Sequence, residues 1–92
     1  MEDKIHMISA ASQVLTFRKS NPMAIDEEIF QHVTDYISEE GVRNEKTRRA
    51  MIATASRTFK LARERPELSE KDILKKVMED IPEILMSIEE EY

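Results

Sequence analysis

The sequence predicts an all-α protein of four helices, built as two tandem duplicated helix–turn–helix hairpins in a compact, bundle-like domain. Apolar residues recur at helical spacing throughout and nowhere alternate as they do in a strand. The 92 residues include a single glycine. Residues 7–39 also align with residues 51–83 without a gap, at an offset of 44. This alignment has nine identities in 33 pairs, including Ala11/Ala55, Ser12/Ser56 and Pro22/Pro66.

The first helix is expected over about residues 3–20. Its buried face is predicted from the helical spacing of Ile5, Ile8, Ala11 and Leu15. Asn21-Pro22 should end this helix, because the residue before a proline is disfavoured in the α region.

The second helix is expected to end at about Glu40 and to begin either at Pro22 or after Asp26, which would be a good N-cap. Ile29, Val33 and Ile37 form its apolar line. Gly41 follows, where a left-handed residue commonly terminates a helix. Residues 41–44 are therefore the predicted linker between the two hairpins.

The third helix is expected over about residues 45–65, with Asn44 as its N-cap and Pro66 as its stop. Its predicted inner face consists of Ile52, Ala55, Phe59 and Ala62.

The fourth helix should be capped by Ser69, with Leu68 and Ile73 as a hydrophobic staple. Its predicted core line comprises Ile73, Val77, Ile81, Ile84, Leu85 and Ile88. Pro82 interrupts this line and should kink or restart the helix, because proline removes a backbone hydrogen bond. The acidic residues 89–92 are expected to form a frayed tail.

A chain of this length is expected to form one domain, with hairpins at about residues 3–40 and 45–88. A period of 44 residues also falls in the range of HEAT-type solenoids. Solenoids need about three repeats for stability, so two copies favour a closed four-helix domain.

The composition argues against catalysis. The absence of cysteine excludes disulfides, zinc–thiolate sites and thiol nucleophiles. One glycine provides no phosphate-cradling loop, and neither histidine accompanies a convincing serine nucleophile. We therefore predict no enzyme activity, cofactor or small-molecule substrate. The acidic start and the lack of an apolar run of about 20 residues predict a cytoplasmic protein without a membrane segment.

Basic residues concentrate in residues 43–65, which carry a formal charge of +6, whereas the remainder carries −11. Five of them share one side of the third helix: Lys46, Arg49, Arg57, Lys60 and Arg63. One hypothesis is a nucleic-acid-binding face that contacts phosphates, assisted by Thr54, Ser56 and Thr58. The favoured interpretation is a face that pairs with the acidic second and fourth helices, or with those of a second copy.

Two further motifs have simpler explanations. Residues 66–73 look like the turn into a DNA-reading helix, but a capped helix start accounts equally for them and for residues 22–29. Glu28, His32 and Asp35 have a spacing that suits a weak metal site. The second hairpin replaces this histidine by Lys76, so a solvated polar face is favoured and no metal is predicted.

Apolar residues on several sides of the last segment indicate an interface. Leu85, Met86 and Ile88 are the predicted protein-interface residues, because surplus exposed apolar area usually marks an interaction site. The sequence thus predicts a non-catalytic helical interaction module that forms a homodimer or joins a protein complex. The alternative is a nucleic-acid-binding or regulatory protein that uses the basic third helix.

Overall fold

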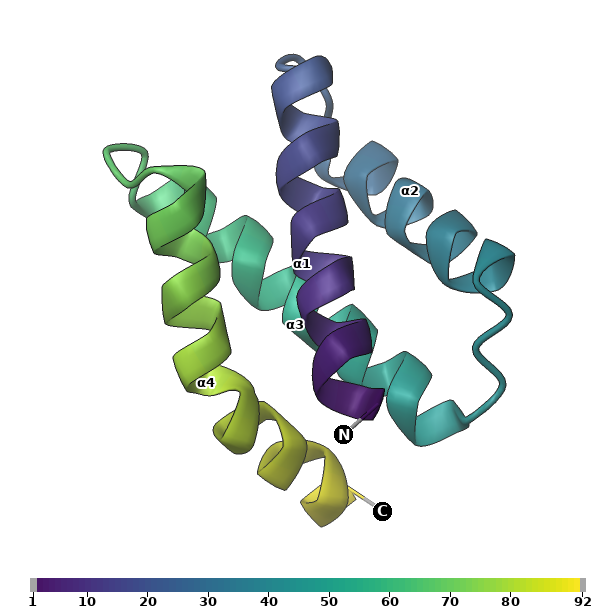
Figure 1. Ribbon diagram of the computed structural model, residues 1–92. Helices are drawn as coiled ribbons and strands as arrows, with labels where there is room; N and C mark the ends of the chain where they lie inside the picture. The colour runs from purple at the N-terminus through teal and green to yellow at the C-terminus, as the bar shows by residue number, and fades with distance from the viewer. Residues whose placement is uncertain (1, 92) are drawn as a thin grey trace.

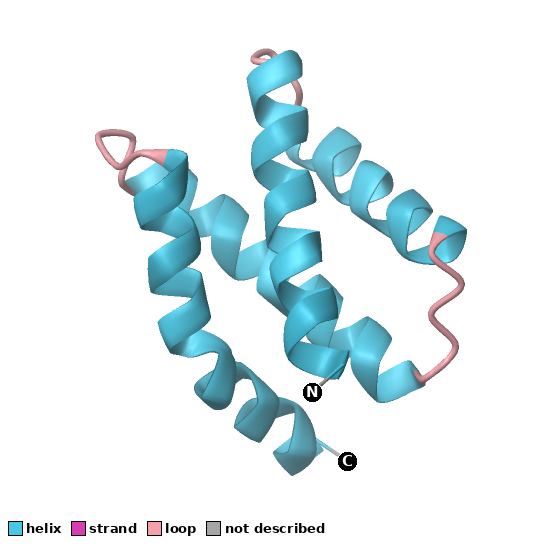
Figure 2. Ribbon diagram, in the orientation of Figure 1, coloured by secondary structure: helices cyan, strands magenta, loops and turns pink. Residues whose placement is uncertain are grey.

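The computed structural model describes residues 2–91, which form four α-helices: α1 (Glu2–Ser20), α2 (Asp26–Glu39), α3 (Glu45–Glu64) and α4 (Glu70–Glu91). Within this range the chain has no strand, as Figure 2 shows. The radius of gyration is 12.4 Å, close to the ~12 Å expected of a compact chain of this length. The predicted all-α class with four helices is confirmed.

Helices α1 and α3 form the centre of the molecule. They pack against each other, and each contacts both remaining helices. Helices α2 and α4 lie on opposite sides of this pair and make no contact with one another. Figure 1 shows α1 crossing in front of α3, with α2 and α4 to either side. The outer faces of α2 and α4 are therefore not covered by another helix of the described chain.

Small side chains make the crossing of α1 and α3 close. The fully buried residues here include Ala10, Ala11, Ala50, Thr54 and Ala55. Short side chains let two helix backbones approach and fill the space between them at the density of a protein interior. The larger apolar residues of α2 and α4 then close the core on each side of the crossing.

This crossing explains where the predicted inner faces were wrong. Ile5 and Ile52 were expected to be buried, but 69% of Ile5 and 40% of Ile52 is exposed. The buried stripes instead centre on Met7 in α1 and Met51 in α3, each fully buried. The two isoleucines lie to one side of these stripes, because the two helices meet along the faces that hold the two methionines and the buried alanines.

Local signals located most helix ends correctly. Asn44 Oδ1 accepts the Thr47 N–H at 3.0 Å, and Ser69 Oγ accepts the Asp72 N–H at 3.1 Å. Both predicted N-caps are thereby confirmed.

The start of α2 differs from the prediction. Asp26 is the first helical residue and not the N-cap, which is Ile25. Ile25 has no side-chain acceptor, but its own N–H donates to Glu28 Oε1 at 2.9 Å. This bond from the N-cap N–H to a carboxylate one turn into the helix is one of the two hydrogen bonds of a capping box.

Helix α4 continues through Pro82 without a break. Figure 1 shows its axis changing direction in its second half, as expected of a helix that contains a proline. The helix extends to Glu91, and Tyr92 of the predicted frayed tail lies outside the described residues. In residues 2–91 no helix is long and apolar enough to cross a membrane.

Gly41 provides a direct test of how the first hairpin ends. Its φ is +69°, and an added Cβ would meet no atom within 4 Å. Gly41→Ala should therefore lower the free energy of unfolding through backbone strain alone, by about 1–2 kcal/mol. Gly41→Asn should cost less, because asparagine tolerates the left-handed region. Urea denaturation would measure both, and equal losses would contradict the backbone explanation.

Candidate functional site

The five basic residues predicted to share a face all project from α3, and we call them the basic row: Lys46, Arg49, Arg57, Lys60 and Arg63. The described parts of α2 and α4 place acidic side chains close to this row. The structure therefore brings together opposite charges that lie far apart in the sequence.

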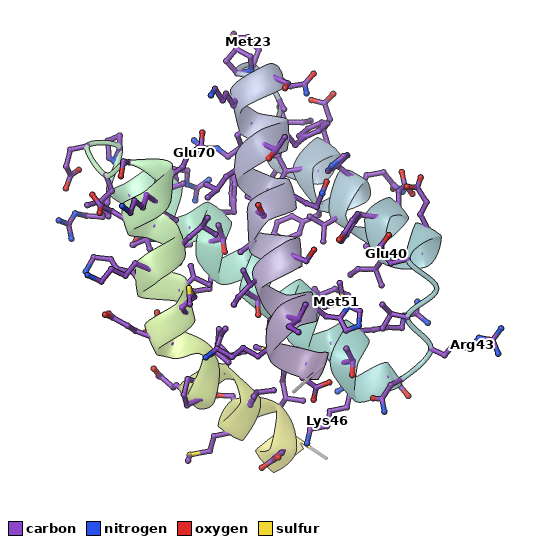
Figure 3. All side chains as sticks on the ribbon, viewed as in Figure 1. Met23, Glu40, Arg43, Lys46, Met51 and Glu70 are labelled. Carbon is purple, nitrogen blue, oxygen red and sulfur yellow. The ribbon has the colours of Figure 1, made fainter. Side chains whose placement is uncertain are left out.

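Helix α4 supplies two of these acidic partners. Lys46 Nζ lies 2.8 Å from Glu89 Oε1, and Arg57 Nη1 lies 3.2 Å from Asp80 Oδ2. Figure 3 shows Lys46 at the end of the molecule where α4 finishes. The first pair thus joins the start of α3 to the end of α4, and the second joins the middles of the two helices.

In two further ion pairs of the basic row the charged atoms lie farther apart. Arg63 Nη1 lies 3.4 Å from Asp26 Oδ2 at the start of α2, and Arg49 Nε lies 3.9 Å from Glu45 Oε1 one turn earlier in α3. Exposed pairs of this kind contribute only about 0–1 kcal/mol each. Together they nevertheless reduce the charge that the basic row offers to an external anion, which favours the intramolecular interpretation.

The two threonines proposed to assist phosphate binding do not face solvent. Thr54 and Thr58 are fully buried, and their hydroxyls donate to the carbonyl oxygens of Ala50 and Thr54 at 2.7 Å. Only Ser56 of the three is exposed. This part of the nucleic-acid hypothesis is wrong, because the threonines face the tightly packed side of α3.

The suggested metal ligands of α2 have other contacts. His32 Nε2 lies 3.0 Å from Gln13 Oε1 of α1, and the imidazole stacks on Phe17 with ring centroids 4.5 Å apart. Asp35 and Glu28 bind Gln31 and the Ile25 N–H respectively. Among the described side chains no group of three His, Asp or Glu residues could hold a metal ion. His32 instead helps to join α1 to α2.

The three predicted interface residues occupy different environments. Ile88 is buried in the core with Met7 and Ile84, and Leu85 is half-buried at the edge of the same cluster. Met86 is 62% exposed. Only Met86 is therefore well presented to a partner.

Sequence inspection missed a neighbour of Met86. Met78 is 42% exposed and was not among the predicted interface residues. Pro82, between the two methionines, is also exposed. Met78, Pro82 and Met86 follow one another at intervals of four, which places them along one side of α4. We call them the apolar row, and the spacing alone would have revealed it.

The structure also contains a surface pocket where the turns of the two hairpins meet. The turns are residues 21–25, between α1 and α2, and residues 65–69, between α3 and α4. The pocket has an apolar floor and a charged rim, and its lining includes Leu15, Arg18, Lys19, Phe59, Arg63 and Glu70. No sequence motif marks it, because its residues come from two stretches far apart in the sequence, residues 15–26 and 59–73.

A side-chain hydrogen bond braces the second of these turns. Arg65 Nε donates to Glu67 Oε2 at 2.6 Å. This bond, which stabilises the ionised carboxylate, lowers the pKa of Glu67 below its ordinary value. Glu67 is fully exposed, so water screens this interaction and it is a local feature of the turn.

Comparisons with known protein families, with curated proteins and with solved structures found no match. Three surfaces of the described residues are candidates for a function: the basic row, the apolar row and the pocket between the turns.

Matched substitutions in the basic row test its structural role. Arg57→Gln should lower the free energy of unfolding by up to about 1 kcal/mol, because Asp80 loses its partner. Lys60→Gln removes the same charge from a residue that has no acidic partner in the described chain, and should have almost no effect. Urea denaturation at low and high salt would measure the difference, which should shrink as salt screens the pair. Equal effects would argue against a specific pair.

Proposed function

We propose that this chain is a non-catalytic helical interaction module that forms a homodimer through the apolar row of α4. The main observation in support is that Met78, Pro82 and Met86 line an outer face of α4 that no other described helix covers. We expect it to act in the cytoplasm without a cofactor, as the sequence suggests.

The physics of a small domain supports this proposal. A chain of about 90 residues buries only about two-thirds of the surface that its unfolded form exposes, so association adds useful burial. Exposed apolar side chains aligned on one helix usually mark an interface. Methionine also suits such a surface, because its flexible side chain adapts to the partner that it meets.

The spacing along α4 supports a two-fold, antiparallel arrangement. Met78 lies four residues before Pro82, and Met86 lies four residues after it. If two copies of α4 pair about Pro82, Met78 meets the partner's Met86. Exposed Lys75 and Glu89, seven residues on either side of Pro82, then face each other with opposite charges. Self-complementarity of this kind is what an isologous interface requires.

We also infer that the two hairpins arose by duplication. Helices α1 and α3 end 44 residues apart, and α2 and α4 begin 44 residues apart. Buried positions recur at the same offset: Met7/Met51, Ala11/Ala55, Ile29/Ile73, Val33/Val77 and Ile37/Ile81. Thr47 Oγ1 also donates to Asp3 Oδ1 at 2.6 Å, although these residues are 44 apart. Contact between equivalent positions is expected near a pseudo-two-fold axis.

The apolar row does not follow this repeat. The positions 44 residues before Met78 and Pro82 hold Thr34 and Ser38, which are both exposed and polar. An apolar face that occurs in only one hairpin is not needed for the shared fold. This difference supports a function specific to α4.

The second candidate function is the binding of nucleic acid or another polyanion by the basic row. It is favoured by Lys60, which is exposed and has no acidic partner among the described residues. Binding would have to compete with the pairs that Arg57 and Arg63 already make. For this reason we place it after self-association.

Met86→Asp tests the dimer. The wild type should show about twice the chain mass of 10.8 kDa by light scattering, whereas the variant should be a monomer. Because Met86 is largely exposed, the helix content and stability of the variant monomer should change little, within about 0.5 kcal/mol. Met23→Asp is the matched control, since Met23 is 90% exposed but lies in the turn after α1. A monomeric wild type, or a dimer that Met86→Asp leaves intact, would contradict the proposal.

Charge reversal tests the antiparallel orientation. Lys75→Glu should weaken the dimer by placing a carboxylate opposite the partner's Glu89. Adding Glu89→Lys together with Lys46→Glu, which preserves the ion pair between these two residues within each chain, should restore it. Failure of this triple variant to recover would contradict this orientation, even if the apolar row is the interface.

A short random duplex DNA distinguishes the second candidate. The proposed dimer should have the same mass at low and high salt, and adding the DNA should not change this mass. A complex that forms at low salt, dissociates at high salt and disappears on replacing Arg57, Lys60 and Arg63 by Gln would instead favour the basic row, because phosphate contacts weaken steeply with salt.

A further inference from the structure

The pocket between the two turns lies at the end of the molecule where α1 and α3 finish and α2 and α4 begin. Its lining contains pairs of residues 44 positions apart, including Leu15/Phe59, Lys19/Arg63 and Asp26/Glu70. Both hairpins thus contribute equivalent positions to one concave surface. Such a surface resembles the interface between two subunits, where ligand pockets commonly form.

Two arginines converge on one aromatic ring in this pocket. The guanidinium carbons of Arg18 and Arg63 lie 5.9 Å and 5.3 Å from the centroid of the Phe59 ring. Each distance is within the range of a cation–π interaction. Two cations on one ring repel each other, so an anion bound beside Arg18 would relieve this repulsion.

The positive charge of the pocket is only partly compensated. Arg63 lies 3.4 Å from Asp26 Oδ2. Arg18 and Lys19 have no acidic partner in the part of the chain that the structure describes, although both line the pocket. Lys19 is exposed and Arg18 is half-buried, which leaves both side chains accessible to a ligand.

We propose that this pocket binds a small organic anion, in which a carboxylate or phosphate is attached to an apolar or aromatic body. The anionic group would contact Arg18 and Lys19, because charge-assisted hydrogen bonds to arginine are among the strongest available. The apolar body would lie against the exposed or half-buried apolar residues of the lining, which are Pro22, Ala24, Pro66 and Leu68. The site is independent of the proposed dimer, since it lies at the start of α4, before the apolar row.

Glu70 adds a constraint on the ligand. It lines the same pocket and has no cationic partner among the described residues. Figure 3 shows it at the start of α4, near the upper part of α1. A ligand that carries a hydroxyl or amino donor opposite its anionic group would satisfy this carboxylate, so the site favours such a molecule over a simple anion.

A titration with phenyl phosphate, benzoate and inorganic phosphate tests the proposal. Amide chemical shifts of the ¹⁵N-labelled protein should move saturably around residues 15–26 and 59–73 with phenyl phosphate or benzoate. Inorganic phosphate, which lacks the apolar body, should bind at least about tenfold more weakly. The relative response to phenyl phosphate and benzoate identifies the preferred anionic group.

Arg18→Gln should weaken phenyl phosphate binding by about tenfold or more, as expected from loss of a hydrogen bond to a charged group. Lys60→Gln is the matched control, because it removes the same charge from α3 outside the pocket and should leave the affinity unchanged. Both variants should keep the wild-type circular dichroism spectrum. Shifts spread over the whole basic row, equal losses in the two variants, or no saturable binding of any probe would overturn the assignment.

Discussion

The close crossing of α1 and α3 is the constraint on which the rest of the structure depends. Their contact includes four alanines and Thr54, all fully buried, together with Met7 and Met51, and the short side chains let the two backbones approach closely. Helices α2 and α4 must then pack on opposite sides of the pair, where they do not touch each other. This arrangement gives each of them an outer face without a helical neighbour. The exposure of the apolar row therefore follows from the size of side chains in two other helices.

Charge reinforces the same arrangement. Helix α3 carries the basic row, and both flanking helices place carboxylates beside it: Asp80 and Glu89 from α4, and Asp26 from α2. Each pair is exposed and individually weak, but all three act between helices and so favour one docking of α2 and α4. The concentration of positive charge in one helix of an acidic protein is thus understandable without an external polyanion. This explanation does not include Lys60, or Arg49, which pairs with Glu45 of its own helix.

The helix ends depend on residues close together in the sequence, and most were predicted correctly. Part of the buried face of α3 and the pocket depend on contacts between distant segments and were missed. Asn44, Ser69 and Gly41 act within one turn of the backbone, so the helix ends that they define were recognisable. The buried line of α2 was predicted correctly, and so was that of α4 except for Leu85, which is half-buried. Ile52 and Thr54 were assigned to the wrong faces of α3, since hydrophobicity ranks isoleucine as the more buried residue. Close packing at the crossing reverses that order by selecting small side chains. The pocket could not be predicted, because it forms between residues 15–26 and 59–73, which are far apart in the sequence.

The two hairpins differ most where the proposed functions lie. Five pairs of buried positions 44 residues apart hold the same residue in both hairpins. Among the exposed positions, only α4 has an apolar row and only α3 has a basic row. The pocket is the exception, because equivalent positions of both hairpins form it, yet Arg18 has an alanine, Ala62, as its counterpart. A site between two similar halves needs such asymmetry to bind an asymmetric molecule in one orientation. Because the second hairpin has no charge at the equivalent position, the shared fold does not require Arg18. A role of Arg18 in ligand binding can therefore be distinguished from a role in folding.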